Sequence, residues 1–330
     1  MQPTPHFVFR CDAGPRAGAG HFMRQLAVAQ HAKRHGSVTV LVPSEGRVLL
    51  EHLDPEIRGF VLHDQQPLDE AAWMLETFGP SAIYVVDSYR LPPEYYDALA
   101  RRSRSVVFDD GERDLPAALT VRPRPGSSAR ASVLEGCAYI PVRQNFSRRT
   151  TTRGARNLVV SFGASDPTGA TATALSRLPA ETLGDWRLTV VHGPLASCDD
   201  LGLERLRDGG WTIDVVRSPD MPSLLATADA AVVAAGSIVW ELAAVGVPTA
   251  AFAVVDNQAR NARWLSEHRC IAGGWRLGAR PIMESADLIA FLTNAQWRES
   301  LVDTLSGQID GSGGRRVVEA ALALDSGGSR

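Results

Sequence analysis

Residues 7–24 read FVFRCDAGPRAGAGHFMR, which contains a complete turn from a buried strand into a helix. The apolar run from Phe7 to Cys11 predicts a strand, and Phe22, Leu26 and Ala29 then follow at helical spacing. The turn between them is rich in glycine, and such a turn before a helix leaves backbone N–H groups available for an anion. This stretch therefore predicts an α/β fold with a ligand site at the carboxyl end of its first strand.

The same alternation of short apolar runs and helical spacing continues along the chain. Most of the later runs are nearly continuously apolar, which is typical of parallel strands covered by helices on both faces. We therefore expect two doubly wound parallel-sheet domains, 1–146 and 157–330, facing a cleft, with a polar, basic linker at 147–156. The expected strands are Phe7–Cys11, Val38–Val42, Gly59–His63, Ala82–Val86, Ser105–Phe108, Leu158–Phe162, Leu188–Val191, Thr212–Val216, Ala230–Ala234 and Thr249–Ala253.

The composition excludes several classes of function. Lys plus Arg (34) nearly balance Asp plus Glu (37), so no excess of positive charge favours a nucleic acid as a partner. No apolar run approaches the roughly 20 residues that cross a membrane, and the amino terminus lacks a secretion signal, so we expect a cytoplasmic protein. The 4 cysteines are far apart and form no cluster with histidine, so we expect no metal.

His21 is the strongest candidate for a catalytic residue in the first turn. At the start of a helix the positive dipole end favours the neutral imidazole, which can take a proton from water or a hydroxyl. Asp12 could orient that ring or bind substrate hydroxyls, and Arg10 and Arg24 could pair with a phosphate or carboxylate. The alternative is a histidine that caps the helix without a catalytic task. Met23 stands where a dinucleotide fingerprint needs its third glycine, which disfavours NAD.

The other candidates follow further predicted strands. Acidic side chains at the carboxyl ends of parallel strands can hold sugar hydroxyls or cap the next turn. Glu241, in the first turn of a helix, can compensate the helix dipole or accept hydrogen bonds from the two hydroxyls of a ribose. The candidates are Gly18 and Gly20 in the first turn, then Asp87, Tyr89, Asp109 and Asp110, and in the second half Gly163, Asp166, Gly236, Ser237, Glu241, Asn257 and Gln258.

Taken together, these motifs resemble a known family. The order and spacing are similar to the UDP-sugar hydrolases of pseudaminic acid biosynthesis (the PseG family) and their spore-coat polysaccharide relatives. The carboxyl-terminal part is also similar to GT-B glycosyltransferases that resemble MurG. The motifs are Arg10-x-Asp12, Gly18-x-Gly20-His21-x-x-Arg24, Asp87-x-Tyr89, Asp109-Asp110, Gly163-x-x-Asp166, Gly236-Ser237-x-x-x-Glu241, Asn257-Gln258 and Asp310-Gly311-x-Gly313.

The resemblance implies a GT-B fold whose carboxyl half holds UDP and whose amino half holds the sugar. It implies inverting hydrolysis at the anomeric carbon, without a metal or other cofactor, with His21 activating water and Asp12 nearby. Glu241 would hold the ribose, and backbone groups around Gly163, Gly236 and Ser237 would hold the diphosphate. UDP is a good leaving group that needs charge stabilisation more than a general acid, which agrees with one base acting alone.

The sequence departs from the family pattern in three places. It reads Asp12-Ala13-Gly14 where the family reads Asp-Ala-Ser, and Gly163-Ala164-Ser165-Asp166 where the family reads Gly-Gly-x-Asp. The stretch Leu119–Pro123 lacks the aspartate and asparagine of the family. A different sugar or nucleotide is therefore compatible with the sequence. Two other functions also fit: a GT-B glycosyltransferase in which His21 deprotonates an acceptor hydroxyl, and a nucleotide-sugar binding protein without turnover.

Overall fold

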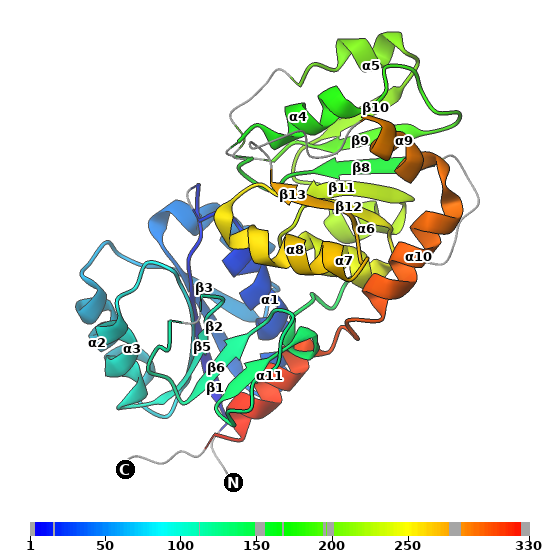
Figure 1. The fold of residues 1–330 in the computed structure, drawn as a ribbon. Helices are drawn as coiled ribbons and strands as arrows, with labels where there is room; N and C mark the ends of the chain where they lie inside the picture. Colours follow the sequence, from blue (N-terminus) through cyan, green and yellow to red (C-terminus); the bar gives the residue numbers. More distant parts are fainter. Residues whose placement is uncertain are drawn as a thin grey trace. The chain divides into compact units, whose positions relative to one another are not determined.

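The computed structural model describes residues 4–15, 17–111, 113–148, 156–166, 168–193, 196, 201–276 and 285–324 (Figure 1). The chain divides into two units, one formed by the residues up to Gln144 together with those from Gly311 onward, and one by Asn145–Asp310. Most of the predicted linker, 149–155, lies outside the described residues. No helix in the described part is both long and apolar enough to span a membrane.

The first unit contains a seven-stranded parallel sheet in the order β3-β2-β1-β4-β5-β6-β7. Its strand order reverses between β1 and β4, and ligands of open α/β sheets bind at the carboxyl ends of strands at such a point. The strands are β1 (His6–Cys11), β2 (Ser37–Val42), β3 (Ile57–Val61), β4 (Ile83–Asp87), β5 (Arg104–Phe108), β6 (Leu119–Arg122) and β7 (Val133–Glu135). The helices are α1 (Gly20–Ala32), η1 (Ser44–His52), α2 (Pro67–Phe78), α3 (Pro93–Ala100), η2 (Cys137–Tyr139) and α11 (Gly313–Leu322).

Helices cover both faces of this sheet. Phe7 and Phe9 of β1 pack into the core that α1 and α11 form on one face, and Val8 packs with α2 and α3 on the other. Alternate residues of a strand point to opposite faces, so a strand covered on both faces must be apolar throughout. This explains why β1 and β4 were visible in the sequence as largely apolar runs, although each contains a buried charged residue, Arg10 or Asp87.

The last helix, α11, packs on α1 of the first unit. Residues 311–324, which the sequence analysis grouped with the second domain, therefore fold with the first. A glycine pair permits the close approach: a Cβ at Gly313 would lie 2.2 Å from the Ile140 carbonyl oxygen, and one at Gly314 would lie 2.9 Å from His31 Cδ2. Val317, Val318 and Ala321 form an apolar face of this helix that is buried in the core of the first unit. The apolar face alone could not indicate which domain covers it.

The second unit is built around a six-stranded parallel sheet in the order β10-β9-β8-β11-β12-β13. Its strands are β8 (Asn157–Ser161), β9 (Arg187–Val191), β10 (Thr212–Val216), β11 (Ala230–Ala234), β12 (Thr249–Ala253) and β13 (Ala272–Arg276). Its helices are α4 (Ala170–Arg177), α5 (Glu204–Asp208), α6 (Met221–Ala226), α7 (Ile238–Val245), η3 (Asp256–Gln258), α8 (Ala259–Glu267), α9 (Ser285–Thr293) and α10 (Ala295–Ser306). Every strand predicted from the sequence is present, with β3 two residues earlier than expected, whereas β6, β7 and β13 were not predicted.

Candidate active site

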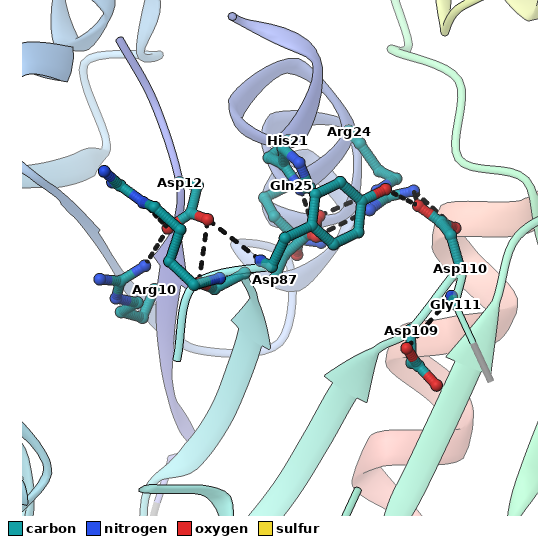
Figure 2. Close-up of polar contacts among 12 residues, drawn as sticks. Arg10, Asp12, His21, Arg24, Gln25, Asp87, Asp109, Asp110 and Gly111 are labelled. Carbon is teal, nitrogen blue, oxygen red and sulfur yellow. Dashed lines mark hydrogen bonds and ion pairs between the residues drawn. The ribbon is translucent and has the colours of Figure 1, made fainter. Parts of the chain in front are cut away.

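His21 lies in the first turn of α1, next to the carboxyl end of β4 (Figure 2). The side chain is buried, and its Nδ1 is 2.6 Å from Oδ1 of Asp87. Because the carboxylate is an acceptor, a neutral ring donates its Nδ1–H there and keeps its lone pair on Nε2. The contact therefore prepares Nε2 to take a proton from water or a hydroxyl.

Asp87 is completely buried and accepts four hydrogen bonds from side chains of α1. These come from His21, from two nitrogens of Arg24, and from the Gln25 amide at 2.9 Å. Burial alone would raise the pKa of Asp87. The opposing effect of Arg24 and His21 is larger, so the pKa of the carboxyl lies well below its usual range. The sequence predicted that Asp87 binds substrate. An ionised carboxylate with four donors is better suited to hold His21 in place than to bind a substrate directly.

Arg24 joins Asp87 to a second carboxylate, Asp110, through Nη1 at 2.8 and 3.0 Å. The Tyr89 hydroxyl donates to the same carboxylate at 2.7 Å. The Tyr89 ring meets the His21 ring edge to face, with centroids 4.5 Å apart. Since Tyr89 is 40% exposed, its ring forms a solvent-facing wall beside His21.

Asp12, the other predicted catalytic residue, lies on the opposite face of the sheet from His21. It accepts hydrogen bonds from Arg10 Nη1 at 2.6 Å, from Ser88 Oγ at 2.9 Å and from the Tyr89 backbone N–H at 3.1 Å. Among the described residues no contact joins it to His21. Asp12 follows Arg10 by two residues and therefore shares its face, whereas α1 covers the other face. The ring is thus oriented by Asp87, and Asp12 fixes the turn that carries Tyr89.

Arg10 is buried and held within the protein. Its Nε donates to Glu70 at 2.8 Å, and Glu70 also accepts from the Tyr95 hydroxyl at 2.9 Å. With Asp12 on Nη1, the guanidinium faces two carboxylates. This contrasts with the role in binding a phosphate or carboxylate that was expected from the sequence.

Asp109 and the glycines of the first turn complete this edge of the first unit. Asp109 is completely buried and accepts from the backbone N–H groups of Gly111 and Arg113, which is the capping alternative noted above. Gly18 has φ of +70°, and a Cβ on Gly18 or Gly20 would meet no atom within 4 Å. The two glycines therefore leave room for a ligand to approach the backbone.

In the second unit, the turn after β8 is held by a helix cap. Asp166 accepts hydrogen bonds from the backbone N–H groups of Ala170 and Thr171 at 2.7 and 3.0 Å, at the start of α4. Gly163 has φ of +91°, and a Cβ on Gly193 would lie 2.3 Å from its carbonyl oxygen. The glycines of this turn thus permit two loops to pack closely, and the Asp166 carboxylate is occupied by the helix.

The turn between β11 and α7 brings the other predicted residues of the second unit together. Ser237 precedes α7 without a side-chain capping bond, and Glu241 lies largely buried in the first turn. Gln258 accepts from the Val254 N–H through Oε1, and its Nε2 lies 3.5 Å from the Cβ position of Gly236. Asn257 lies in η3, and its side chain lies outside the described part of the structure.

Asn261 is an additional residue at this turn. Its Nδ2 donates to the Ala235 carbonyl oxygen at 2.9 Å, while its buried Oδ1 has no hydrogen-bond partner within the described residues. Asn261 was not among the candidates from the sequence. Its position one helical turn after Asn257 is the signal that could have found it.

The described residues contain no group of three or more His, Cys, Asp or Glu side chains able to hold a metal ion. What the first unit offers is a buried imidazole with a fixed acidic partner. The second unit offers two strand-to-helix turns, and in the turn after β8 the backbone of Gly163 packs closely against Gly193.

Two Rossmann-like domains with parallel sheets of seven and six strands define the GT-B fold, as the sequence predicted. The chain is similar to MurG of Acinetobacter baumannii, with a TM-score of 0.66 and 16% identity over 96% of this chain and 99% of that one. It is also similar to HepE of Anabaena in complex with UDP and glucose, with a TM-score of 0.60 and 14% identity over 97% and 100% of the two chains.

No family model matches the chain. Among curated proteins it is similar to the spore coat polysaccharide biosynthesis protein SpsG of Bacillus subtilis (strain 168), with 21% identity over 276 residues, 79% of this chain and 81% of SpsG. This similarity agrees with the spore-coat resemblance found in the sequence.

Proposed function

We propose that the protein hydrolyses a nucleotide-activated sugar, a UDP-linked amino or deoxy sugar of the pseudaminic type, at its anomeric carbon. The observation that carries the proposal is the contact between His21 and Asp87, which leaves Nε2 of a neutral ring as a base. His21 takes a proton from water, the water oxygen bonds to the anomeric carbon, and UDP leaves with the bonding electrons. Direct displacement inverts the configuration at that carbon.

The second unit supplies the nucleotide site in this proposal. Backbone N–H groups around Gly163, Gly236 and Ser237 bind the diphosphate and stabilise the charge that develops on it. Glu241 accepts hydrogen bonds from the ribose hydroxyls. HepE, a protein of the same fold, was crystallised with UDP and glucose, which supports UDP as the nucleotide.

Positioning of the base is expected to contribute about 10²–10⁴-fold to the rate. Tyr89, with its exposed ring beside His21, is placed to contact the sugar. Asp87 and Asp12 act as positioning residues, the first on His21 and the second on the Tyr89 turn.

A second candidate function is glycosyl transfer, in which the same base deprotonates an acceptor hydroxyl. It is favoured by the number of glycosyltransferases with this fold, such as SnogD of Streptomyces nogalater. A nucleotide-sugar binding protein without turnover is the third.

Incubation of the purified protein with a panel of UDP-sugars and no acceptor separates the three. Proton NMR that shows free sugar and UDP in equal amounts, with the inverted anomer formed first, supports hydrolysis. Release only after an acceptor is added supports transfer, and tight binding without release supports the third function. His21→Gln should remove turnover while His35→Gln, at an exposed histidine beyond the end of the same helix, retains it.

A further inference from the structure

Among the described residues, Arg113, Arg122 and Arg124 lie with Asp109 and Glu135 at the carboxyl ends of β5, β6 and β7. Asp109 pairs with Arg113, whose Nε lies 3.1 Å from Oδ1. Glu135 pairs with Arg124, whose Nε and Nη2 lie 3.0 and 2.9 Å from Oε1. The third arginine, Arg122 at the end of β6, shares these two carboxylates at longer range and has no hydrogen bond to either.

Arg122 lies close to both acids but bonds to neither. Its nearest carboxylate oxygens, on Asp109 and Glu135, are both 4.0 Å away, which is beyond hydrogen-bond distance. Its side chain is only 13% exposed, and its Nε is buried without a hydrogen-bond partner. Within the described residues, no hydrogen bond involves its guanidinium. A guanidinium carries five N–H donors, and a buried charged donor without an acceptor is costly to maintain.

The chemistry of this group selects its ligand. A guanidinium is a planar fork whose two N–H groups match the two oxygens of a carboxylate. We propose that Arg122 is an anion-binding residue that receives a carboxylate group.

The position of Arg122 suggests where the carboxylate comes from. His21 is held at the end of β4, and Arg122 ends β6, two strand spacings away, or roughly 10 Å. The exposed ring of Tyr89 and the carboxylate of Asp110 follow β4 and β5 along the same edge. A sugar with its anomeric carbon at His21 can extend an acidic substituent toward Arg122, which narrows the proposed UDP-linked sugar to one that carries a carboxylate, such as an amino sugar of the uronic-acid type. A carboxylate that belongs to the sugar substrate rests on the proposed function. The other source is a free small carboxylic acid, which would bind Arg122 whether or not the proposed function holds.

Thermal unfolding with defined ligands tests the inference. The probes are UDP, UDP-glucose, UDP-glucuronic acid, free glucose and free glucuronate, applied to the wild type, to Arg122→Met and to Arg104→Met. Arg104 is the matched control, because it lies at the opposite end of β5 and bonds to the Ser81 carbonyl oxygen. If the carboxylate belongs to the sugar, UDP-glucuronic acid raises Tm more than UDP-glucose does. Arg122→Met removes that difference but keeps the shift caused by UDP, and Arg104→Met keeps both.

The remaining outcomes separate the two proposals. A shift with free glucuronate but not glucose, lost in Arg122→Met, supports a free carboxylate as the ligand. Equal shifts for acidic and neutral ligands in every protein would overturn the inference and leave the proposed function intact. No shift with UDP or either UDP-sugar would instead count against the proposed function, while glucuronate still tests Arg122.

Discussion

His21 Nδ1 and Asp87 Oδ1 lie 2.6 Å apart, although the two residues are separated by 66 positions in the chain. The pair forms because β4 lies next to β1, the strand that leads into the helix of His21. Cys11, the last residue of β1, is in register with Asp87, so the acid arrives directly beside the turn. The strand order, and not the local motif, thus decides which carboxylate orients the imidazole.

Asp87→Asn should reduce kcat by roughly 10²–10⁴-fold, the value of a positioned base. An asparagine amide donates to Nδ1 as readily as it accepts from it, so it no longer holds the proton on that nitrogen. The pH dependence of kcat and the nitrogen chemical shifts of His21 report this change in tautomer, which a merely structural role would not produce.

Gln25→Leu is the matched control for this variant. It also removes a hydrogen bond to Asp87, on Oδ2, but leaves the contact with His21 in place. We expect less than about a tenfold loss of kcat, because the lost hydrogen bond does not involve His21 and the contact that orients the ring remains. A folded Asp87→Asn protein with wild-type kcat and pH profile would show that Asp87 does not position the base.

The sequence predicted the domains' architecture because buried parallel strands are apolar over most of their length, and β11 is apolar throughout. It missed β6, which has four residues with alternating burial, and β7, which has three. Strands this short, with alternate residues only partly buried, carry little periodic signal.

The site was predicted only where local sequence decides it. The position of His21 at the start of a helix follows from the glycine-rich turn and the apolar spacing after it. The identity of its partner does not, because Asp12 is near in sequence but on the other face of the sheet, and Asp87 is distant in sequence but adjacent in space. The packing of α11 on the first unit is non-local for the same reason.

Arg10→Met should destabilise the first unit by about 3–5 kcal/mol, because it leaves Glu70 and Asp12 as buried carboxylates without their cation. Chemical denaturation measures this loss. The affinity for UDP, which the proposed function assigns to the second unit, should remain unchanged. If Arg10→Met instead weakened nucleotide binding without lowering stability, Arg10 would belong to the ligand site, as the sequence analysis supposed.

His31, at the last turn of α1, should make stability fall as the pH drops below about 6.5. Burial, with the nearby charges of Arg34 and Arg315, lowers its pKa in the folded state. Above 6.5 both states are neutral, but at lower pH the unfolded chain binds a proton that the folded protein does not, which favours unfolding. The loss continues until the pH reaches the lower pKa of the folded state.

The measurement is the difference in Tm between the wild type and His31→Gln as a function of pH. The wild type should lose stability relative to the variant between about pH 7 and pH 5. His6, whose pKa is also lowered by burial, is present in both proteins and cancels. The exposed His52 provides the control, since His52→Gln should leave the pH dependence of Tm as it is in the wild type. Parallel Tm curves for the wild type and His31→Gln would contradict the prediction.

Gly14→Ser, which restores the residue of the resembling family, should destabilise this protein by about 1–3 kcal/mol. Gly14 has φ of +129°, which L side chains rarely adopt, and an added Cβ would lie 2.6 Å from Glu45 Cγ. Gly20→Ser is the matched control, because a Cβ there meets nothing within 4 Å, and we expect a change within about 0.5 kcal/mol. Equal stabilities of the two variants in chemical denaturation would show that the first turn adapts to a side chain. The departure from the family at Gly14 would then need a reason in substrate binding and not in backbone conformation.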